Sequence, residues 1–329
     1  MKLIGLEEHF ATPEVVAAWL GLDPSRQDLA VPRSTGNDKE NMLLDLAEAR
    51  IAAIDEAGIS IQVLSLTTPG VQTLAAGEAV PLSRAVNDLA AATVRHRPDR
   101  FQAFATLPFG VPDAAARELE RAVVGLGLNG AMVFGRVGER NIDHPDFAPI
   151  LETAARLRAP LYLHPQTPQI GVRDAYYRGL GERMEGFFAT SGIGWHYESG
   201  MQAVRLVLSG AFERLPDLRL ILGHWGEVVL FYLERLDMLT PMAKLPRPVS
   251  NYFTSNMWVT PSGLLSHRYM RWAIEVMGVE RVMFATDYPF LMAKGGRARR
   301  FLEEAELSSA HRDRIAFGNW QALVADIRR

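Results

Sequence analysis

Short runs of apolar residues alternate along the chain with longer segments in which apolar residues recur every three or four positions. The short runs predict buried parallel strands, and the longer period predicts amphipathic helices. The predicted strands are Leu3–Leu6, Gln62–Leu66, Phe101–Thr106, Ala131–Phe134, Leu161–Leu163, Leu218–Leu222, Met257–Val259 and Val282–Ala285. The predicted helices are Asn41–Ala57, Leu82–Arg97, Ala114–Leu126, Phe147–Leu157, Gly200–Leu208, Val228–Leu239, Leu265–Met277 and Arg299–Ala305. Strands alternating with helices in this number favour an α/β fold, a closed (β/α)8 barrel of the TIM type.

Three segments do not fit the alternation of strands and helices. Gly21–Asp38 is polar and rich in turn residues, Pro165–Gly194 is long, and Thr240–Ser255 contains three prolines. The first two are expected as loop insertions after strands one and five, which places them on the face where barrels carry their active sites. The absence of repeats and linkers predicts a single domain over residues 1–329.

Composition narrows the classes of function. The chain has no cysteine, which excludes disulfides and thiolate metal sites. Its net charge is -3 with both signs mixed, so nucleic acid is not an expected partner. Charged residues follow the first few apolar ones too soon for a signal peptide, and no apolar run reaches the ~18 residues of a membrane span. We therefore expect a cytoplasmic protein without a membrane segment.

Side chains able to bind a metal ion stand at the ends of four predicted strands, where a barrel opens into its active site. These strand-end residues are Glu7, His9, His164, His224 and Asp287. Because residues two apart in a strand point the same way, Glu7 and His9 can face one ion while Glu8 faces outward. Mixed carboxylate and imidazole ligands suit Zn²⁺, Mn²⁺ or Fe²⁺.

A single histidine after an apolar strand is more often a packed side chain than a ligand, so the hypothesis depends on several such residues coinciding. The chain has 8 histidines, and three of them stand at predicted strand ends. His196 lies after the second long segment and is expected to be structural, with a place in the pocket as the alternative.

Four short motifs carry a family resemblance: Leu6-Glu7-Glu8-His9-Phe10, Leu163-His164-Pro165, Gly223-His224-x-Gly226-Glu227 and Thr286-Asp287-Tyr288-Pro289-Phe290. In order and spacing they resemble the amidohydrolase superfamily. More narrowly, they resemble its aminocarboxymuconate-semialdehyde decarboxylase-like branch, which includes the γ-resorcylate, 2,3-dihydroxybenzoate and 5-carboxyvanillate decarboxylases. Two-metal members of the superfamily use a bridging lysine on strand four, and Gly130–Gly138 contains none.

The resemblance implies one divalent metal ion, zinc or manganese, bound by Glu7, His9, His164 and Asp287. It also implies non-oxidative decarboxylation of a hydroxylated aromatic acid of the ortho-hydroxybenzoate type. In this reaction a proton is added to the ring carbon that bears the carboxylate, and CO2 then leaves. Asp287 is the implied proton donor, and His224 would orient it or stabilise the developing charge.

The resemblance further implies a homodimer or homotetramer, because in relatives the residue matching Arg235 reaches the substrate of a neighbouring subunit. Without the resemblance, Arg235 is better interpreted as a solvated helix residue. Phe134 stands where relatives often have a substrate-contacting asparagine, and Gln166 where γ-resorcylate-type enzymes tend to have arginine. The hydroxylation pattern of the substrate is therefore expected to differ. Arg33, Arg173 and Arg178 are weaker candidates for binding an anionic substrate.

Two other classes of function stay open on the residues alone. A hydrolase or hydratase of the same superfamily, acting on a lactone, an ester or an unsaturated acid, needs similar metal ligands. A non-catalytic barrel could instead bind a partner through its long segments, although intact ligands on four separate strands argue against it.

Overall fold

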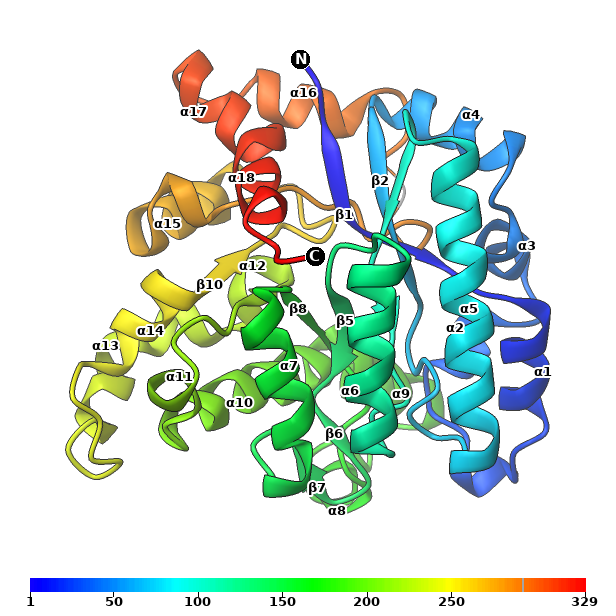
Figure 1. Ribbon diagram of the computed structural model, residues 1–329, viewed down its shortest axis with the longest axis horizontal. Helices are drawn as coiled ribbons and strands as arrows, with labels where there is room; N and C mark the ends of the chain where they lie inside the picture. The colour runs from blue at the N-terminus through cyan, green and yellow to red at the C-terminus, as the bar shows by residue number, and fades with distance from the viewer. Residues whose placement is uncertain (292) are drawn as a thin grey trace.

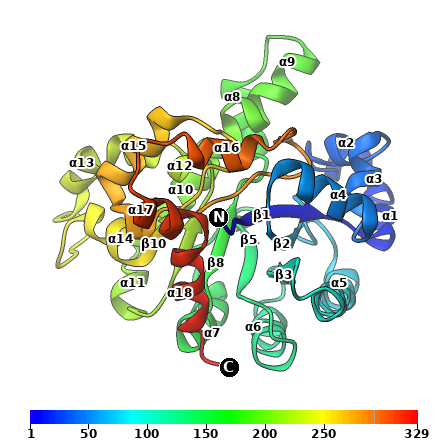
Figure 2. The ribbon, with the colours of Figure 1, turned by 90° about the horizontal axis from the view of Figure 1, so that it is seen from above.

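The computed structural model describes residues 1–291 and 293–329, and parallel strands lie at its centre inside a layer of helices (Figure 1, Figure 2). Two all-parallel sheets run in the orders β1-β2-β3 and β4-β5-β8-β9-β10. Their bounds are β1 (Ile4–Phe10), β2 (Ile61–Leu66), β3 (Phe101–Ala103), β4 (Ala105–Thr106), β5 (Ala131–Phe134), β8 (Leu161–His164), β9 (Leu220–Leu222) and β10 (Met257–Val259). A short antiparallel ribbon, β6 (Arg136–Val137) and β7 (Arg140–Asn141), follows β5.

Backbone hydrogen bonds join the two sheets into a ring. Between β3 and β4, the Phe104 amide donates to the Leu64 carbonyl at 2.9 Å. On the opposite side, the Met283 amide donates to the Val259 carbonyl at 2.9 Å, and the Leu6 amide donates to the Phe284 carbonyl at 3.0 Å. The predicted closed barrel is confirmed, with its eighth strand making isolated bridges to its neighbours in place of a regular ladder.

The interior of the barrel is filled by its own apolar cluster, separate from the larger one between strands and helices. The inner cluster includes Leu6, Met132 and Ile221, and Trp320 packs against it from α18 (Asn319–Ala325). The Trp320 indole also donates to the Gln102 side chain at 2.8 Å, near the start of β3. The core therefore occupies the N-terminal half of the barrel, which leaves the C-terminal ends of the strands for a site.

The outer helices include α4 (Glu48–Ala57), α5 (Ala76–His96), α6 (Pro112–Glu120), α7 (Ala148–Leu157), α10 (Gly194–Leu208), α15 (His267–Met277) and α16 (Arg297–Glu303). Shorter helices are α11 (Ala211–Arg214), α12 (His224–Glu227), α13 (Leu233–Leu236), α14 (Val249–Asn256) and α17 (Ser309–Asp313). The third irregular segment thus ends in a helix, α14, that its prolines had hidden. No helix in the described part of the chain is both long and apolar enough to cross a membrane.

Two predicted helices are interrupted. Asn41–Ala57 divides into α3 (Asp38–Leu44) and α4, because the Asp45 carboxylate accepts from the Ala47 and Arg50 amides at 2.8 and 3.1 Å and so caps a new helix. Val228–Leu239 consists of short turns around α13. Its apolar period arises partly from aromatic side chains that face outward, since Phe231 is 70% exposed.

The two predicted insertions lie at the C-terminal mouth of the barrel. The first, Gly21–Asp38, contains α2 (Val31–Ser34) and lies between α1 (Pro13–Leu20) and α3. The second contains α8 (Ile170–Tyr176) and α9 (Glu182–Phe187), which stand out from the rim (Figure 2). They touch where the Thr167 hydroxyl donates to the Asp28 carboxylate at 2.5 Å. The two insertions together therefore form one side of the mouth.

Replacing Gly130 by alanine is expected to destabilise the barrel. Gly130 has φ of 105°, and a Cβ there would overlap the Pro160 carbonyl oxygen. We expect a loss of at least ~2 kcal/mol in the free energy of unfolding, measured by urea denaturation. The control is Gly77→Ala in α5, where no atom lies within 4 Å of an added Cβ. Equal midpoints for the two variants would contradict the expectation.

Candidate metal centre

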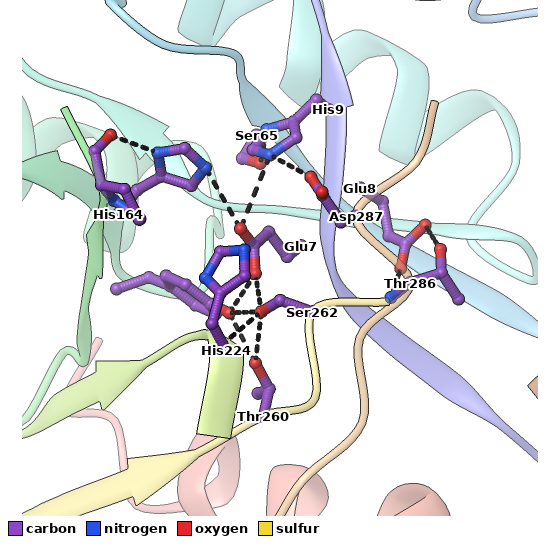
Figure 3. Close-up of polar contacts among 12 residues, drawn as sticks. Glu7, Glu8, His9, Ser65, His164, His224, Thr260, Ser262, Thr286 and Asp287 are labelled. Carbon is purple, nitrogen blue, oxygen red and sulfur yellow. Dashed lines mark hydrogen bonds and ion pairs between the residues drawn. The ribbon is translucent and has the colours of Figure 1, made fainter. Parts of the chain in front are cut away.

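Four predicted metal ligands converge at the C-terminal mouth (Figure 3). Ligand atoms of Glu7, His9 and His164 all lie within 4.8 Å of one another. The Glu7 Oε1 atom is 3.1 Å from His164 Nε2 and 3.8 Å from His9 Nε2, and Asp287 Oδ1 is 3.4 Å from His9 Nε2. The fold therefore brings together the four residues whose strands are separated by most of the chain.

When His164 is neutral, its nitrogen that faces Glu7 has no proton to donate. His164 Nδ1 lies 2.7 Å from the Pro165 carbonyl, which can only accept, so a neutral His164 presents an unprotonated Nε2 to Glu7. Glu7 Oε1 and His9 Nε2 are both buried and have no hydrogen-bond partner among the described residues. Unpaired buried polar atoms are costly, and a cation between them would satisfy both. The donors fit a Zn²⁺ or Mn²⁺ ion.

The charges of the centre are strongly coupled. Burial alone would raise the pKa of Glu7, but His224, His164 and His9 lower it well below its usual range. Burial would lower the pKa of His9, yet Asp287 and Glu7 raise it to about 9. The carboxylates thus hold protons on nearby imidazoles, and a divalent ion can replace that positive charge.

His224 lies beside Glu7 (Figure 3) at the start of α12. Its Nδ1 is 2.8 Å from Glu227 Oε1, and His196 Nδ1 is 2.9 Å from the other oxygen of Glu227. Burial opposes protonation of His224, but Glu227 and Glu7 raise its pKa to about 10. The His196 ring centroid lies 4.4 Å from that of His224, so His196 is next to the centre and shares Glu227 with His224.

Glu8 faces away from the cluster of Glu7, His9 and His164, as predicted, into a buried polar network behind the strand (Figure 3). Its carboxylate accepts from the amide and hydroxyl of Thr286, at 2.9 and 2.6 Å, and from Gln62 at 2.9 Å. Burial raises the pKa of Glu8 to about 7, and the bonds from Thr286 limit the rise. Arg50 donates to both Gln62 and the His9 carbonyl, at 2.7 and 2.8 Å. This network therefore braces the backbone of His9 and the residue before Asp287, two of the predicted ligands.

The backbone of Asp287 explains why such bracing is needed. Asp287 has φ of 59°, a left-handed conformation that is unfavourable for aspartate. Thr286 on one side is bonded to Glu8, and the Tyr288 ring on the other lies 4.5 Å from the Arg50 guanidinium carbon. Contacts of Thr286 and Tyr288, the residues on either side, therefore hold the backbone of Asp287 in this conformation.

The remaining predicted residues have different locations. The Phe134 ring lies against that of His164, with centroids 5.7 Å apart, so it lines the centre. Gln166 accepts from the Arg136 amide at 2.9 Å and so braces the loop after β5. Arg235 is exposed on α13 and makes no ion pair within the described residues. Arg33 lies over the rings of Phe187 and Trp195, at 5.8 and 5.3 Å from their centroids.

Several residues that support the predicted ligands were not singled out from the sequence. They are Arg50, Ser65, Tyr162, Thr260, Ser262 and Thr286, which bond to Glu7, Glu8 or His9 or to groups that do. Glu227 stands in a quoted motif, but its contact with His224 was not predicted. Tyr162 had a usable signal, since it precedes His164 by two positions on one strand and must face the same way. The contacts of Arg50 depend on the packing of α4 on the barrel, which no local pattern encodes.

A barrel that presents carboxylates and imidazoles to one cation at its C-terminal mouth defines a metal-dependent enzyme, and comparison with known proteins gives its family. The family model described as amidohydrolase matches residues 18–323. The chain belongs to the amidohydrolase family.

The relatives of known activity are decarboxylases. The γ-resorcylate decarboxylase of Rhodococcus jostii is 35% identical over 339 residues, covering 98% of this chain and 97% of that protein. The crystal structure of 5-carboxyvanillate decarboxylase from Sphingomonas paucimobilis has a TM-score of 0.89 at 33% identity, covering 98% and 99% of the two chains. A dihydroxybenzoic acid decarboxylase from a Polaromonas species has a TM-score of 0.85 at 34% identity, covering 98% and 97%. The predicted decarboxylase branch and carboxy-lyase class are confirmed.

Removing the Thr286 hydroxyl is expected to weaken metal binding. Thr286→Val keeps the shape of the side chain but leaves Glu8 without one donor, which loosens the backbone before Asp287. We expect metal affinity to fall at least ~10-fold, as for other outer-shell partners, measured by competition with a chromophoric chelator. Thr153→Val, at a buried threonine of α7, is the matched control. An affinity equal to that of the control would show that Glu8 does not position the ligand.

Proposed function

We propose that this chain removes the carboxylate of an ortho-hydroxybenzoate-type acid as CO2, without an oxidant, at one divalent ion bound by Glu7, His9, His164 and Asp287. The supporting observation is a pair of buried atoms, Glu7 Oε1 and His9 Nε2, which lie 3.8 Å apart and have no hydrogen-bond partner in the described part of the chain. The relatives named above act on hydroxylated aromatic acids, which is the substrate class that this centre would take.

Manganese is the favoured ion and zinc the alternative. The Polaromonas dihydroxybenzoic acid decarboxylase was crystallised with bound manganese and the inhibitor 2-nitroresorcinol. A divalent ion, when bound, supplies Lewis-acid attraction for a carboxylate oxygen and an adjacent phenol oxygen of the substrate. Fixing both oxygens orients the ring and its scissile bond.

Asp287 is the assigned proton donor in this proposal. Its side chain is 13% exposed, whereas the side chains of Glu7 and His9 are fully buried, so it is the one of these that faces the mouth. The proton passes to the ring carbon that bears the carboxylate. The bond to the carboxylate then breaks, its electron pair restores the aromatic ring, and CO2 leaves. His224, fixed by Glu227, would orient Asp287 and offset the charge that it acquires.

Two side chains are assigned to substrate binding. Phe134 would pack against the aromatic ring beside His164, and it offers no hydrogen bond to a ring hydroxyl. Arg33 would face an anionic substituent. Burial lowers its pKa while Asp287 raises it, and the described residues offer it no ion-pair partner.

The assembly is proposed to be a homodimer or homotetramer in which Arg235 reaches the pocket of a neighbouring subunit. Large apolar side chains are exposed around α13: Phe231 is 70% exposed and stacks on Trp272, which is 43% exposed. Met238 and Met242 add to this surface, at 59% and 69% exposure. An apolar surface of this kind is typical of an interface, and a second copy of the chain is its proposed occupant.

The reaction is tested with a panel of ortho-hydroxybenzoates and metal-analysed protein, following CO2 release. We expect turnover of at least one acid, loss of turnover on chelation and its return with Mn²⁺. Asp287→Asn removes the proton donor and is expected to lower kcat at least ~100-fold. Absence of turnover with about one metal bound per chain would contradict decarboxylation and favour hydrolase or hydratase chemistry, for which lactones are the next panel.

The role of Arg235 is tested by complementation between two inactive variants. Arg235→Ala alone is expected to lose most activity, as is Asp287→Asn. In randomly mixed dimers about a quarter of the sites pair an intact Asp287 with an intact Arg235 from the partner, so about that share of activity should return. Arg95→Ala, at an exposed arginine of α5, is the control for loss of a surface charge. Mixtures that stay inactive would place Arg235 outside the neighbouring pocket.

A further inference from the structure

The two oxygens of Glu7 have different surroundings. Oε2 accepts hydrogen bonds from the Tyr162 hydroxyl, at 2.6 Å, and from the Ser262 hydroxyl. Oε1 accepts none and faces His164 Nε2 at 3.1 Å (Figure 3). Hydrogen bonds therefore satisfy one oxygen of the carboxylate and leave the other free.

The satisfied oxygen is bonded by a cluster of three hydroxyl groups at the floor of the pocket, from Tyr162, Thr260 and Ser262, here called the hydroxyl cluster. The Tyr162 oxygen is 2.7 Å from that of Thr260 and 3.2 Å from that of Ser262, and the last two are 3.0 Å apart. All three residues are fully buried. Tyr162 and Ser262 direct their protons at Glu7, so Thr260 donates to one of their oxygens and completes the network.

The surroundings of Ser262 show that the cluster is built into the backbone. Its hydroxyl oxygen accepts from the His224 amide at 3.1 Å, which directs its proton toward Glu7. Ser262 has φ of 43°, a conformation that serine rarely adopts. An added Cβ at Gly223 would lie 2.8 Å from Ser262 Oγ and 3.1 Å from Glu7 Oε2, so only glycine allows this approach.

Two hydrogen bonds to one oxygen decide how a carboxylate can bind a metal ion. Hydrogen bonds to an ionised carboxylate are charge-assisted and therefore strong. Donors already bonded to Oε2 compete with a cation for that atom. Glu7 can then offer only Oε1. With one atom each from four protein ligands, an ion with octahedral preference, such as Mn²⁺, retains two positions. An ortho-hydroxybenzoate needs two coordination positions, one for a carboxylate oxygen and one for the phenol oxygen.

We propose that the hydroxyl cluster restricts Glu7 to coordination through one oxygen and so keeps two coordination positions open for the carboxylate and phenol oxygens of the substrate. Tyr162, Thr260 and Ser262 are then positioning residues that act through Glu7. The inference rests on the proposed metal site and adds to it a determinant of substrate chelation.

The test uses Tyr162→Phe, which removes one donor to Oε2 and preserves the packed ring. The probes are 2-nitrophenol, whose oxygen-bearing groups are adjacent and can chelate, and its isomer 3-nitrophenol, in which they are too far apart. Calorimetry on the Mn²⁺-loaded protein is expected to show 2-nitrophenol bound roughly tenfold more weakly by the variant, with 3-nitrophenol unchanged. A crystal structure of the Mn²⁺-loaded variant should show both oxygens of Glu7 on the ion.

Controls separate this effect from general damage. Tyr252→Phe removes the hydroxyl of another buried tyrosine, on α14, and is expected to bind both probes as the unaltered chain does. Ser262→Ala should repeat the selective loss, whereas Ser83→Ala, at a buried serine of α5, should not.

The possible failures point to different conclusions. Equal weakening of both isomers, no weakening of either, or loss of Mn²⁺ binding by the Tyr162 variant alone would overturn the role of the hydroxyl cluster and leave the metal site intact. Failure of the unaltered chain to bind Mn²⁺ would overturn the proposed site itself. Retained single-oxygen coordination in the variant's crystal structure would also reject the inference.

Discussion

The site depends on one electrostatic constraint: a fully buried carboxylate faces the bare nitrogen of an imidazole, and neither atom has a proton to share. Glu7 Oε1 and His164 Nε2 are 3.1 Å apart, and the Pro165 carbonyl fixes the tautomer that creates the conflict. The arrangement is stable only if a positive charge enters it, as a proton or as a metal ion. The surrounding polar groups are arranged so that other bonds of these residues are already made, and only the metal-facing atoms stay unsatisfied.

Two buried hydrogen-bond networks, on opposite sides of β1, determine which polar atoms of these residues are satisfied and which are not. Outside the barrel, Glu8 takes its donors from Thr286 and Gln62, which fixes the approach to Asp287. Inside, the hydroxyl cluster takes the second oxygen of Glu7. Because successive strand residues point in opposite directions, the adjacent glutamates Glu7 and Glu8 serve the two networks separately. One glutamate of this dipeptide therefore faces the proposed metal site, and the other braces the residue before Asp287.

Much of this could be predicted from the sequence. The apolar periods predicted eight strands, and position at strand ends predicted that Glu7, His9, His164 and Asp287 lie close together, because in a barrel those ends share one face. The parts that could not be predicted are tertiary. Arg50 lies in a predicted helix, and no local pattern indicates that its guanidinium donates to the His9 carbonyl of β1. The contact of His196 with Glu227 joins residues 31 positions apart, which no local pattern predicts.

The packing of Trp320 beneath the barrel has a consequence for the order of events in turnover. In the described part of the chain, that side chain and Leu323 pack against the N-terminal end of the barrel interior, so the mouth serves for both entry and exit. A substrate ring lying over the metal ion would stand between the buried ligands and solvent. The gaseous product must then pass the aromatic product or wait for it to leave. Because both products would leave through the same mouth, the escape of CO2 is coupled to the release of its co-product. A mouth still occupied by the aromatic product would favour recapture of CO2 over its loss.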